Sequence, residues 1–233
     1  MKTTTRKRRG FTLVELLVVI AIIATLAGVG VPALIKRQKD GYRAEAIMNA
    51  GQIGKTLFSF EQEYGSYPDD QTATDITTNL SVTVPGSPGK ANYYFAQLVS
   101  SGYLDQEKPF YCRATYTKQP DNNMQSSELL KKGECGFGYV MKTGGEGLSS
   151  ASNSAIPIVV ASLLEGATDD TFDPEVYNQK AVVLRIDTSV RVEQLRPSDK
   201  KIAIGAGKTL LQTGTGTVWE NGNITPQMIG PDY

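Results

Sequence analysis

A single carboxylate, Glu15, lies near the start of an otherwise uncharged apolar run that covers residues 11–35. A charge inside a membrane-spanning helix is unfavourable by about 2.5–3.5 kcal/mol on insertion scales, so this carboxylate needs a partner or a function. The run is long enough for a helix to cross a hydrocarbon core of about 30 Å. The pattern therefore indicates a membrane-spanning helix whose single charge is functional. A basic leader precedes the run and ends at Gly10; its charged residues are Lys2, Arg6, Lys7, Arg8 and Arg9.

The charges that flank the run predict its orientation. Positive flanks stay on the cytoplasmic side, and the leader outweighs the smaller cluster of Lys36, Arg37 and Lys39 that follows the run. We therefore expect the chain from Lys36 onward to lie across the membrane. A cleavable secretory signal is one alternative, but its apolar region would be shorter and a small-residue cleavage site would follow it. A plain single-span anchor is another, and it leaves Glu15 without a role.

The overall composition argues against catalysis and against nucleic-acid binding. The chain contains no histidine, which excludes serine–histidine and cysteine–histidine nucleophiles and removes the commonest metal ligand. We therefore predict that it is not an enzyme. Once the five basic side chains of the leader are set aside, 19 basic and 24 acidic side chains remain. Nucleic-acid binding requires a basic patch, and the remaining charges are mildly acidic, so we expect no nucleic-acid partner.

Two cysteines, Cys112 and Cys135, are candidates for a disulfide. Across the membrane the compartment is oxidising, and closing the loop between them would stabilise the fold by about 3 kcal/mol on the chain-entropy model. Two buried free thiols are the alternative. Zinc is not expected, because two cysteines without a histidine do not supply the four ligands of a structural site.

An acidic loop could supply oxygen ligands to calcium, although its spacing is not that of an EF-hand. An ordinary solvated acidic loop is the alternative, and no other cofactor is predicted. The four candidate ligands are Asp169, Asp170, Asp173 and Glu175.

The carboxylate and the leader must be positioned by one long helix. Apolar residues continue beyond the run at steps of three and four, which predicts a helix that is one-sided over residues 36–64. Pro32 should kink this helix near the outer end of the span, and Gly65 and Pro68 should end it. The predicted stripe consists of Ile47, Ala50, Ile53, Leu57, Phe60 and Tyr64.

Residues 65–233 predict a globular domain whose sheet packs on the second half of that helix, which makes the fold class α+β. Residues 65–92 are rich in turn formers and predict a long loop, and a short helix should follow over residues 93–104. Beyond Pro197 we expect mostly coil with short strands. β-branched and aromatic residues predict four antiparallel strands, with a hairpin turn at residues 187–189: residues 137–142, 156–164, 181–187 and 190–195.

The segment Gly10-Phe11-Thr12-Leu13-Val14-Glu15 resembles the type III signal of type IV pilins and type II secretion pseudopilins. The resemblance implies that a prepilin peptidase cuts between Gly10 and Phe11 and methylates the new amine, so that Glu15 becomes the fifth residue. It also implies a pilin-like fold. Residues 63–68 more loosely resemble major pseudopilins, and the hairpin around Thr188 is similar to one in large environmental-bacterial pilin-like proteins, where glycine would be expected at that position.

The predicted organisation has four parts: a cleaved leader (1–10), a transmembrane and assembly half-helix (11–35), an amphipathic half-helix (36–64) and a periplasmic domain (65–233). We expect a filament subunit in which the amine of Phe11 pairs with Glu15 of a neighbouring copy. The implied partners are the peptidase and methyltransferase, other pilin copies, the inner membrane and an assembly platform. The implied location is the inner membrane or a filament in the periplasm or at the cell surface. The alternative is a membrane-anchored binding or adhesion module that does not polymerise.

Overall fold

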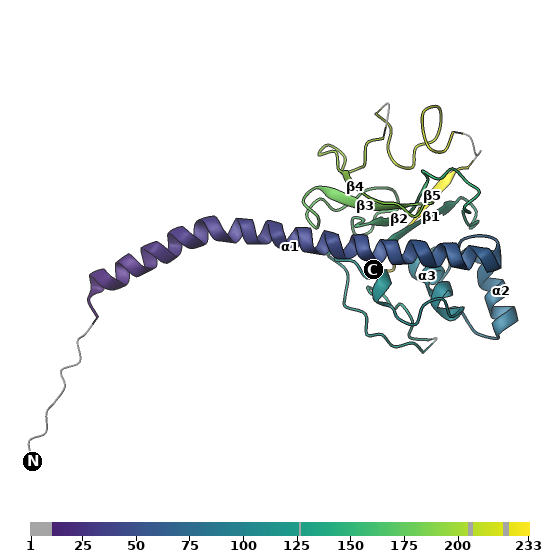
Figure 1. Cartoon of the computed structure of the whole chain (residues 1–233), viewed down its shortest axis with the longest axis horizontal. Coiled ribbons are helices and arrows are strands. Elements are labelled where there is room, and N and C mark those ends of the chain that lie inside the picture. The colour runs from purple at the N-terminus through teal and green to yellow at the C-terminus, as the bar shows by residue number, and fades with distance from the viewer. Residues whose placement is uncertain (1–10, 126, 205–206, 221–223) are drawn as a thin grey trace, which may run out of the picture. The chain divides into compact units, whose positions relative to one another are not determined.

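The structure is a computed structural model that describes residues 11–125, 127–204, 207–220 and 224–233 (Figure 1). The predicted leader, with the processing residue Gly10, lies outside the described residues. The chain divides into two compact units, residues 1–38 and residues 39–233. Its elements are α1 (Leu13–Tyr64), α2 (Asp70–Leu80), α3 (Ala91–Ser100), the short 3-10 helix η1 (Lys108–Phe110), β1 (Gly138–Lys142), β2 (Pro157–Ala161), β3 (Lys180–Arg185), β4 (Val190–Gln194) and β5 (Pro226–Ile229).

The first unit contains the apolar beginning of α1. The helix continues through Pro32 without a break, although this residue cannot donate a backbone hydrogen bond; the kink expected there stays a prediction. The hydroxyl of Thr25 donates to the carbonyl of Ile22 at 2.8 Å. This polar side chain is therefore satisfied inside its own helix, as an apolar environment requires.

The second unit contains the rest of α1, and its buried stripe largely confirms the predicted one. Ile47 and Tyr64 are only partly buried, and Ala46 joins the stripe instead. At Gly54 an added Cβ would lie 2.8 Å from a methyl carbon of Leu184 on β3, so the absence of a side chain permits the close approach of helix and sheet. The fully buried members of the stripe are Ala46, Ala50, Ile53, Leu57 and Phe60.

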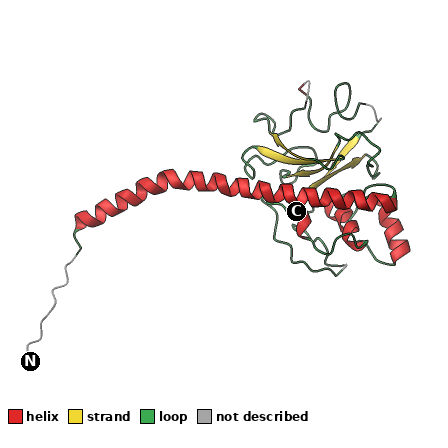
Figure 2. Ribbon diagram, viewed as in Figure 1, coloured by secondary structure: helices red, strands yellow, loops and turns green. Residues whose placement is uncertain are grey.

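The sheet is antiparallel and has the strand order β4-β3-β2-β1-β5, and Figure 2 shows the strands together beside α1. All four predicted strands are confirmed, and β5 is one of the short strands expected beyond Pro197. The predicted hairpin is also present, because β3 and β4 pair antiparallel on either side of the turn. In the turn, Thr188 adopts a φ of 61°, and both the amide and the hydroxyl of Ser189 donate to Asp187. The structure thus confirms the α+β fold of a long helix and an antiparallel sheet.

The prediction of a continuous loop over residues 65–92 is wrong, because α2 lies within it. Asp69 and Thr72 form a capping box at its start: Asp69 accepts from the amide of Thr72 at 2.7 Å, and the Thr72 hydroxyl accepts from the amide of Asp69 at 2.8 Å. Such a reciprocal cap favours helix formation. The Thr72 hydroxyl also donates to the fully buried Gln97 of α3 at 2.6 Å, which ties the two helices together.

The predicted short helix is confirmed as α3, which packs its aromatic side chains into the centre of the second unit. The Phe95 ring lies 5.2 Å from that of Phe110 and 5.5 Å from that of Tyr139, measured between centroids. The Tyr139 hydroxyl donates to the carbonyl of Pro68 at 2.9 Å. These contacts join α3, η1, β1 and the chain before α2 in one core.

Candidate functional site

The beginning of α1 is closed by a reciprocal cap between Thr12 and Glu15. The carboxylate oxygen Oε2 of Glu15 accepts from the amide of Thr12 at 2.9 Å and from its hydroxyl at 2.8 Å. In return the Thr12 hydroxyl accepts from the amide of Glu15 at 3.3 Å, and the Thr12 carbonyl accepts the helix hydrogen bond from Leu16. Glu15 therefore satisfies backbone groups that the first helical turn would otherwise leave open.

This cap is a function of Glu15 that the sequence analysis missed, although its signal was present. Thr-x-x-Glu directly before an apolar run is the pattern of a capping box. A negative charge is also favourable at a helix N-terminus, because the helix dipole places partial positive charge there. Glu15 thus has a local structural role before any neighbouring subunit is considered.

The side chains of the first unit leave α1 with an apolar surface and no cover. Phe11, the predicted first residue after processing, is 75% exposed. Burying each large aliphatic side chain would contribute about 1.5–3 kcal/mol, so this surface favours a lipid or protein environment. Among the described residues, α1 is the one helix long and apolar enough to cross a membrane. The exposed large apolar residues here include Leu13, Val14, Leu16, Leu17, Val18, Val19, Ile20, Ile22, Ile23, Leu26, Val31, Leu34 and Ile35.

The same segment matches a family model. Residues 5–31 fit the prokaryotic N-terminal methylation motif. Part of the chain is similar to pilins. It is 32% identical over 75 residues to the type IV major pilin protein PilE of Neisseria gonorrhoeae, a match covering 32% of this chain and 45% of the relative. It is 40% identical over 63 residues to the type IV major pilin protein PilA of Myxococcus xanthus, covering 27% and 29%.

A secretion protein is among the relatives as well. The pilin-like chain is 31% identical over 88 residues to the type II secretion system core protein G of Vibrio cholerae, covering 38% of this chain and 58% of the relative. It spans about half the length of the curated relatives it matches. No solved structure matches it. These relatives are pilins and a core protein of a secretion system, and their names agree with the prediction that the chain is not an enzyme.

The four predicted calcium ligands are not gathered around one point. Lys201 binds two of them, through ion pairs of 2.7 Å to Asp169 and 2.8 Å to Asp170. Glu175 instead pairs with Lys39 at 3.2 Å. Asp173 accepts from the amide of Glu175 at 2.9 Å, in a turn of its own loop. Calcium binding by this loop stays a prediction, and the Lys201 ammonium competes with it for two of the four carboxylates.

The two cysteines are free thiols in the structure, and both are fully buried. Burial raises the pKa of the Cys135 thiol to about 12 and raises that of Cys112 as well. The chain just after Cys135 passes very close to Cys112: a Cβ at Gly136 would lie 2.5 Å from the Cys112 carbonyl oxygen. The disulfide stays a prediction, and the arrangement corresponds to the alternative of two buried thiols.

Proposed function

We propose that the chain is a structural subunit of a filament of the type IV pilus or type II secretion pseudopilus kind. One observation carries the proposal: the methylation motif coincides with a helix whose apolar side chains are exposed and whose first turn is capped by the carboxylate of Glu15. In this proposal prepilin peptidase cleaves between Gly10 and Phe11, and its methyltransferase activity modifies the new amine of Phe11. The apolar half of α1 is held in the inner membrane before assembly and lies among other copies afterwards.

Glu15 has a free oxygen with which it can bind a neighbouring subunit. Within the described residues, every hydrogen bond accepted by this carboxylate ends on Oε2, so Oε1 remains for another donor. Cleavage would create that donor, a positive amine on Phe11. An amine or carboxylate left alone in a low-dielectric bundle is costly, whereas the pair is tolerated. The pair would therefore favour one axial register between subunits.

The topology and the remaining partners follow from the same segment. A basic leader stays cytoplasmic, which would place residues 39–233 in the periplasm or on a surface filament. Assembly would then require an inner-membrane platform of a pilus or secretion system. The mildly acidic charge balance of the processed chain gives no reason to expect nucleic acid as a partner.

The processing step is tested by the mass of the N-terminus. The full chain is expressed in membranes together with an active prepilin peptidase or with an inactive version of it. The expected product with the active enzyme begins at N-methyl-Phe11, and the chain with the inactive enzyme keeps its leader. A chain that keeps Met1 in both cells would contradict the proposal and support the anchored, non-polymerising module.

The register pair is tested by a variant that separates the charge of Glu15 from its cap. Glu15→Gln keeps an acceptor for the Thr12 amide, because glutamine also forms capping boxes, but it removes the negative charge. Breaking one partner of a buried pair costs about 3–5 kcal/mol, so we expect cleavage to continue and filament yield to fall more than tenfold.

Thr12→Ala is the matched control for this variant. It removes the capping hydroxyl, at a cost of about 1 kcal/mol, but keeps the charge on Glu15. We expect Thr12→Ala to form filaments in the sheared or secreted fraction at close to the normal level. Normal filaments from Glu15→Gln would refute the register pair while leaving the processing proposal intact.

A further inference from the structure

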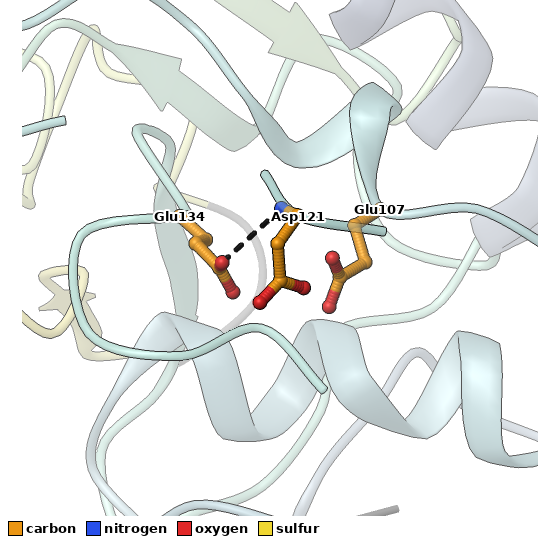
Figure 3. A group of neighbouring side chains, drawn as sticks. All are labelled: Glu107, Asp121 and Glu134. Carbon is orange, nitrogen blue, oxygen red and sulfur yellow. Dashed lines mark hydrogen bonds between the residues drawn. The ribbon is translucent and has the colours of Figure 1, made fainter. Parts of the chain in front are cut away.

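Three carboxylates meet in the segment between α3 and β1, at a place that no sequence motif marks. Glu107 directly precedes η1, Asp121 lies in the following loop, and Glu134 stands just before Cys135. One carboxylate oxygen from each residue lies within 4.8 Å of the other two. Figure 3 shows the three side chains next to one another. Glu107 and Glu134 are buried, and Asp121 is exposed.

The hydrogen bonds of this cluster leave one buried oxygen without a partner. Both oxygens of Glu134 accept backbone hydrogen bonds, from Asp121 at 3.3 Å and from Lys131 at 2.7 Å. In Glu107, Oε1 accepts from the amide of Leu130 at 2.7 Å. Oε2 of Glu107 is buried and has no hydrogen-bond partner among the described residues, while the residue as a whole is 0% exposed. A buried acceptor without a hydrogen-bond donor destabilises the folded state, and the cost is larger when the acceptor belongs to a charged group.

The positive charge near the cluster lies at its exposed side. The ammonium of Lys131 bonds to Asp121 at 3.0 Å and is shared with Glu128. Among the described residues, no lysine or arginine forms an ion pair with Glu107 or Glu134. Burial, together with the charges of Glu134 and Asp121, raises the pKa of Glu107. The buried Oε2 of Glu107 therefore has neither a hydrogen-bond donor nor a positive charge beside it among the described residues.

We propose that Glu107, Asp121 and Glu134 bind a calcium ion. The ligands are all oxygens, which hard cations prefer. The three oxygens lie within 4.8 Å of one another, close enough to share one ion at metal–oxygen distances of about 2.4 Å, the distance typical of Ca²⁺. Mg²⁺ demands near-ideal octahedral geometry and gives up its waters reluctantly, so three carboxylates on an irregular segment favour the larger and more adaptable Ca²⁺. The exposed side at Asp121 leaves room for water to complete the coordination.

Calcium at this place would hold together three stretches of a segment that has little regular structure. The carbonyl of Glu107 accepts from the amide of the buried Phe110, and Glu134 directly precedes the buried Cys135. The amide of Leu130 donates to Glu107. Leu130 itself has a φ of 46°, a strained backbone conformation for a residue with a bulky side chain. A bound ion would fix the position of the Glu107 carboxylate, which accepts the hydrogen bond from this strained residue. The inference does not depend on filament assembly, and it concerns a different site from residues 169–175.

Calcium binding is tested on the full chain in detergent micelles, first treated with EDTA and then freed of it. Calorimetric titration with CaCl₂ should give one site per chain. The midpoint of thermal unfolding should rise by about 5–10 °C when calcium exceeds its Kd a hundredfold. MgCl₂ at the same concentration should give a smaller rise. An equal rise with magnesium would overturn the assignment to calcium.

Two variants locate the ion. Glu107→Gln keeps the shape of the side chain, and it should lower calcium affinity at least tenfold while leaving the EDTA-treated chain at least as stable as the unchanged one. Asp169→Asn, in the other acidic loop, should leave the calcium response unchanged. Loss of the response in Asp169→Asn instead would place calcium in that loop and overturn the proposal. Absence of any calcium effect would overturn the proposal, and stabilisation on acidification would then show that a proton occupies the site.

Discussion

Asp69 carries more of the stability of the second unit than its position in a polar segment suggests. It is 8% exposed. One carboxylate oxygen caps α2 through the amide of Thr72. The other accepts from the hydroxyl of Ser66 and from the buried amide of Gly147, both at 3.1 Å. The side chain thus joins the start of α2 to the chain that follows β1.

The cost of Asp69→Ala follows from these three hydrogen bonds. Loss of an N-cap costs about 0.5–2 kcal/mol. The amide of Gly147 would be left buried and without a partner, at about 1–3 kcal/mol, while the half-buried Ser66 can turn to water and adds little. We expect a loss of about 2–5 kcal/mol in the free energy of unfolding. Asp69→Asn should cost less, because it keeps the cap and loses only the oxygen that accepts from Ser66 and Gly147.

Urea unfolding of the full chain in detergent measures this loss. Trp219 is the one tryptophan of the chain and is buried with its indole N–H on the carbonyl of Leu210, so its fluorescence reports the unfolding of this unit. Asp75→Ala is the matched control on α2, where Asp75 only accepts from Gln71 and about 0.2–0.5 kcal/mol is at stake. If Asp69→Ala and Asp75→Ala differed by less than 0.5 kcal/mol, about the expected error, this account of the cap would be wrong.

Three further predictions use the same preparation. Gly136→Ala should lower the free energy of unfolding by about 1–3 kcal/mol, since the added Cβ meets the Cys112 backbone, whereas Gly41→Ala, in open space, should cause no loss in the urea titration. Cys112 and Cys135 should resist iodoacetamide in the folded chain, because burial raises their thiol pKa values, and each should react once after unfolding without reductant; failure to react would show a disulfide. The pKa of Glu107 is raised above its ordinary 4.5, so the folded state binds more protons than the unfolded one. Its contribution to stability in EDTA should be present below pH 4.5 and fall as pH rises through the folded pKa; Glu107→Gln should remove that part of the pH dependence of the urea midpoint.

The parts of the fold that repeat a simple period could be predicted from the sequence. The stripe of α1 and the β-branched strands each show the spacing of the face they bury, and the hairpin at Thr188 has a polar turn between two such strands. The α2 helix could not be predicted from periodicity, because only Ala73 and Ile76 supply apolar burial and threonine is a weak helix former. Its evidence was the pair Asp69 and Thr72, a cap rather than a stripe.

The Glu15 site and the proposed calcium site also differ in how much local sequence signal they carry. Glu15 could be recognised because a charge in an apolar run is locally anomalous, and only its partnership with Thr12 was missed. Glu107, Asp121 and Glu134 are ordinary surface-type residues in sequence, separated by more than a dozen positions each. Their proximity depends on how the segment between α3 and β1 folds back on itself, and no local spacing encodes that path.

The pairing of β5 with β1 has a consequence for the order in which the chain is made. Residues 226–229 cover the open edge of β1; beyond them, Gly230 accepts from the amide of Ala91 at the start of α3, and the Tyr233 ring packs edge-on against Tyr116. A ribosome that has translated through β4 has therefore not yet made the strand that covers β1 or the contacts that fasten α3. The second unit therefore cannot finish folding until residues 226–233 leave the ribosomal tunnel, long after the apolar start of α1 has left it.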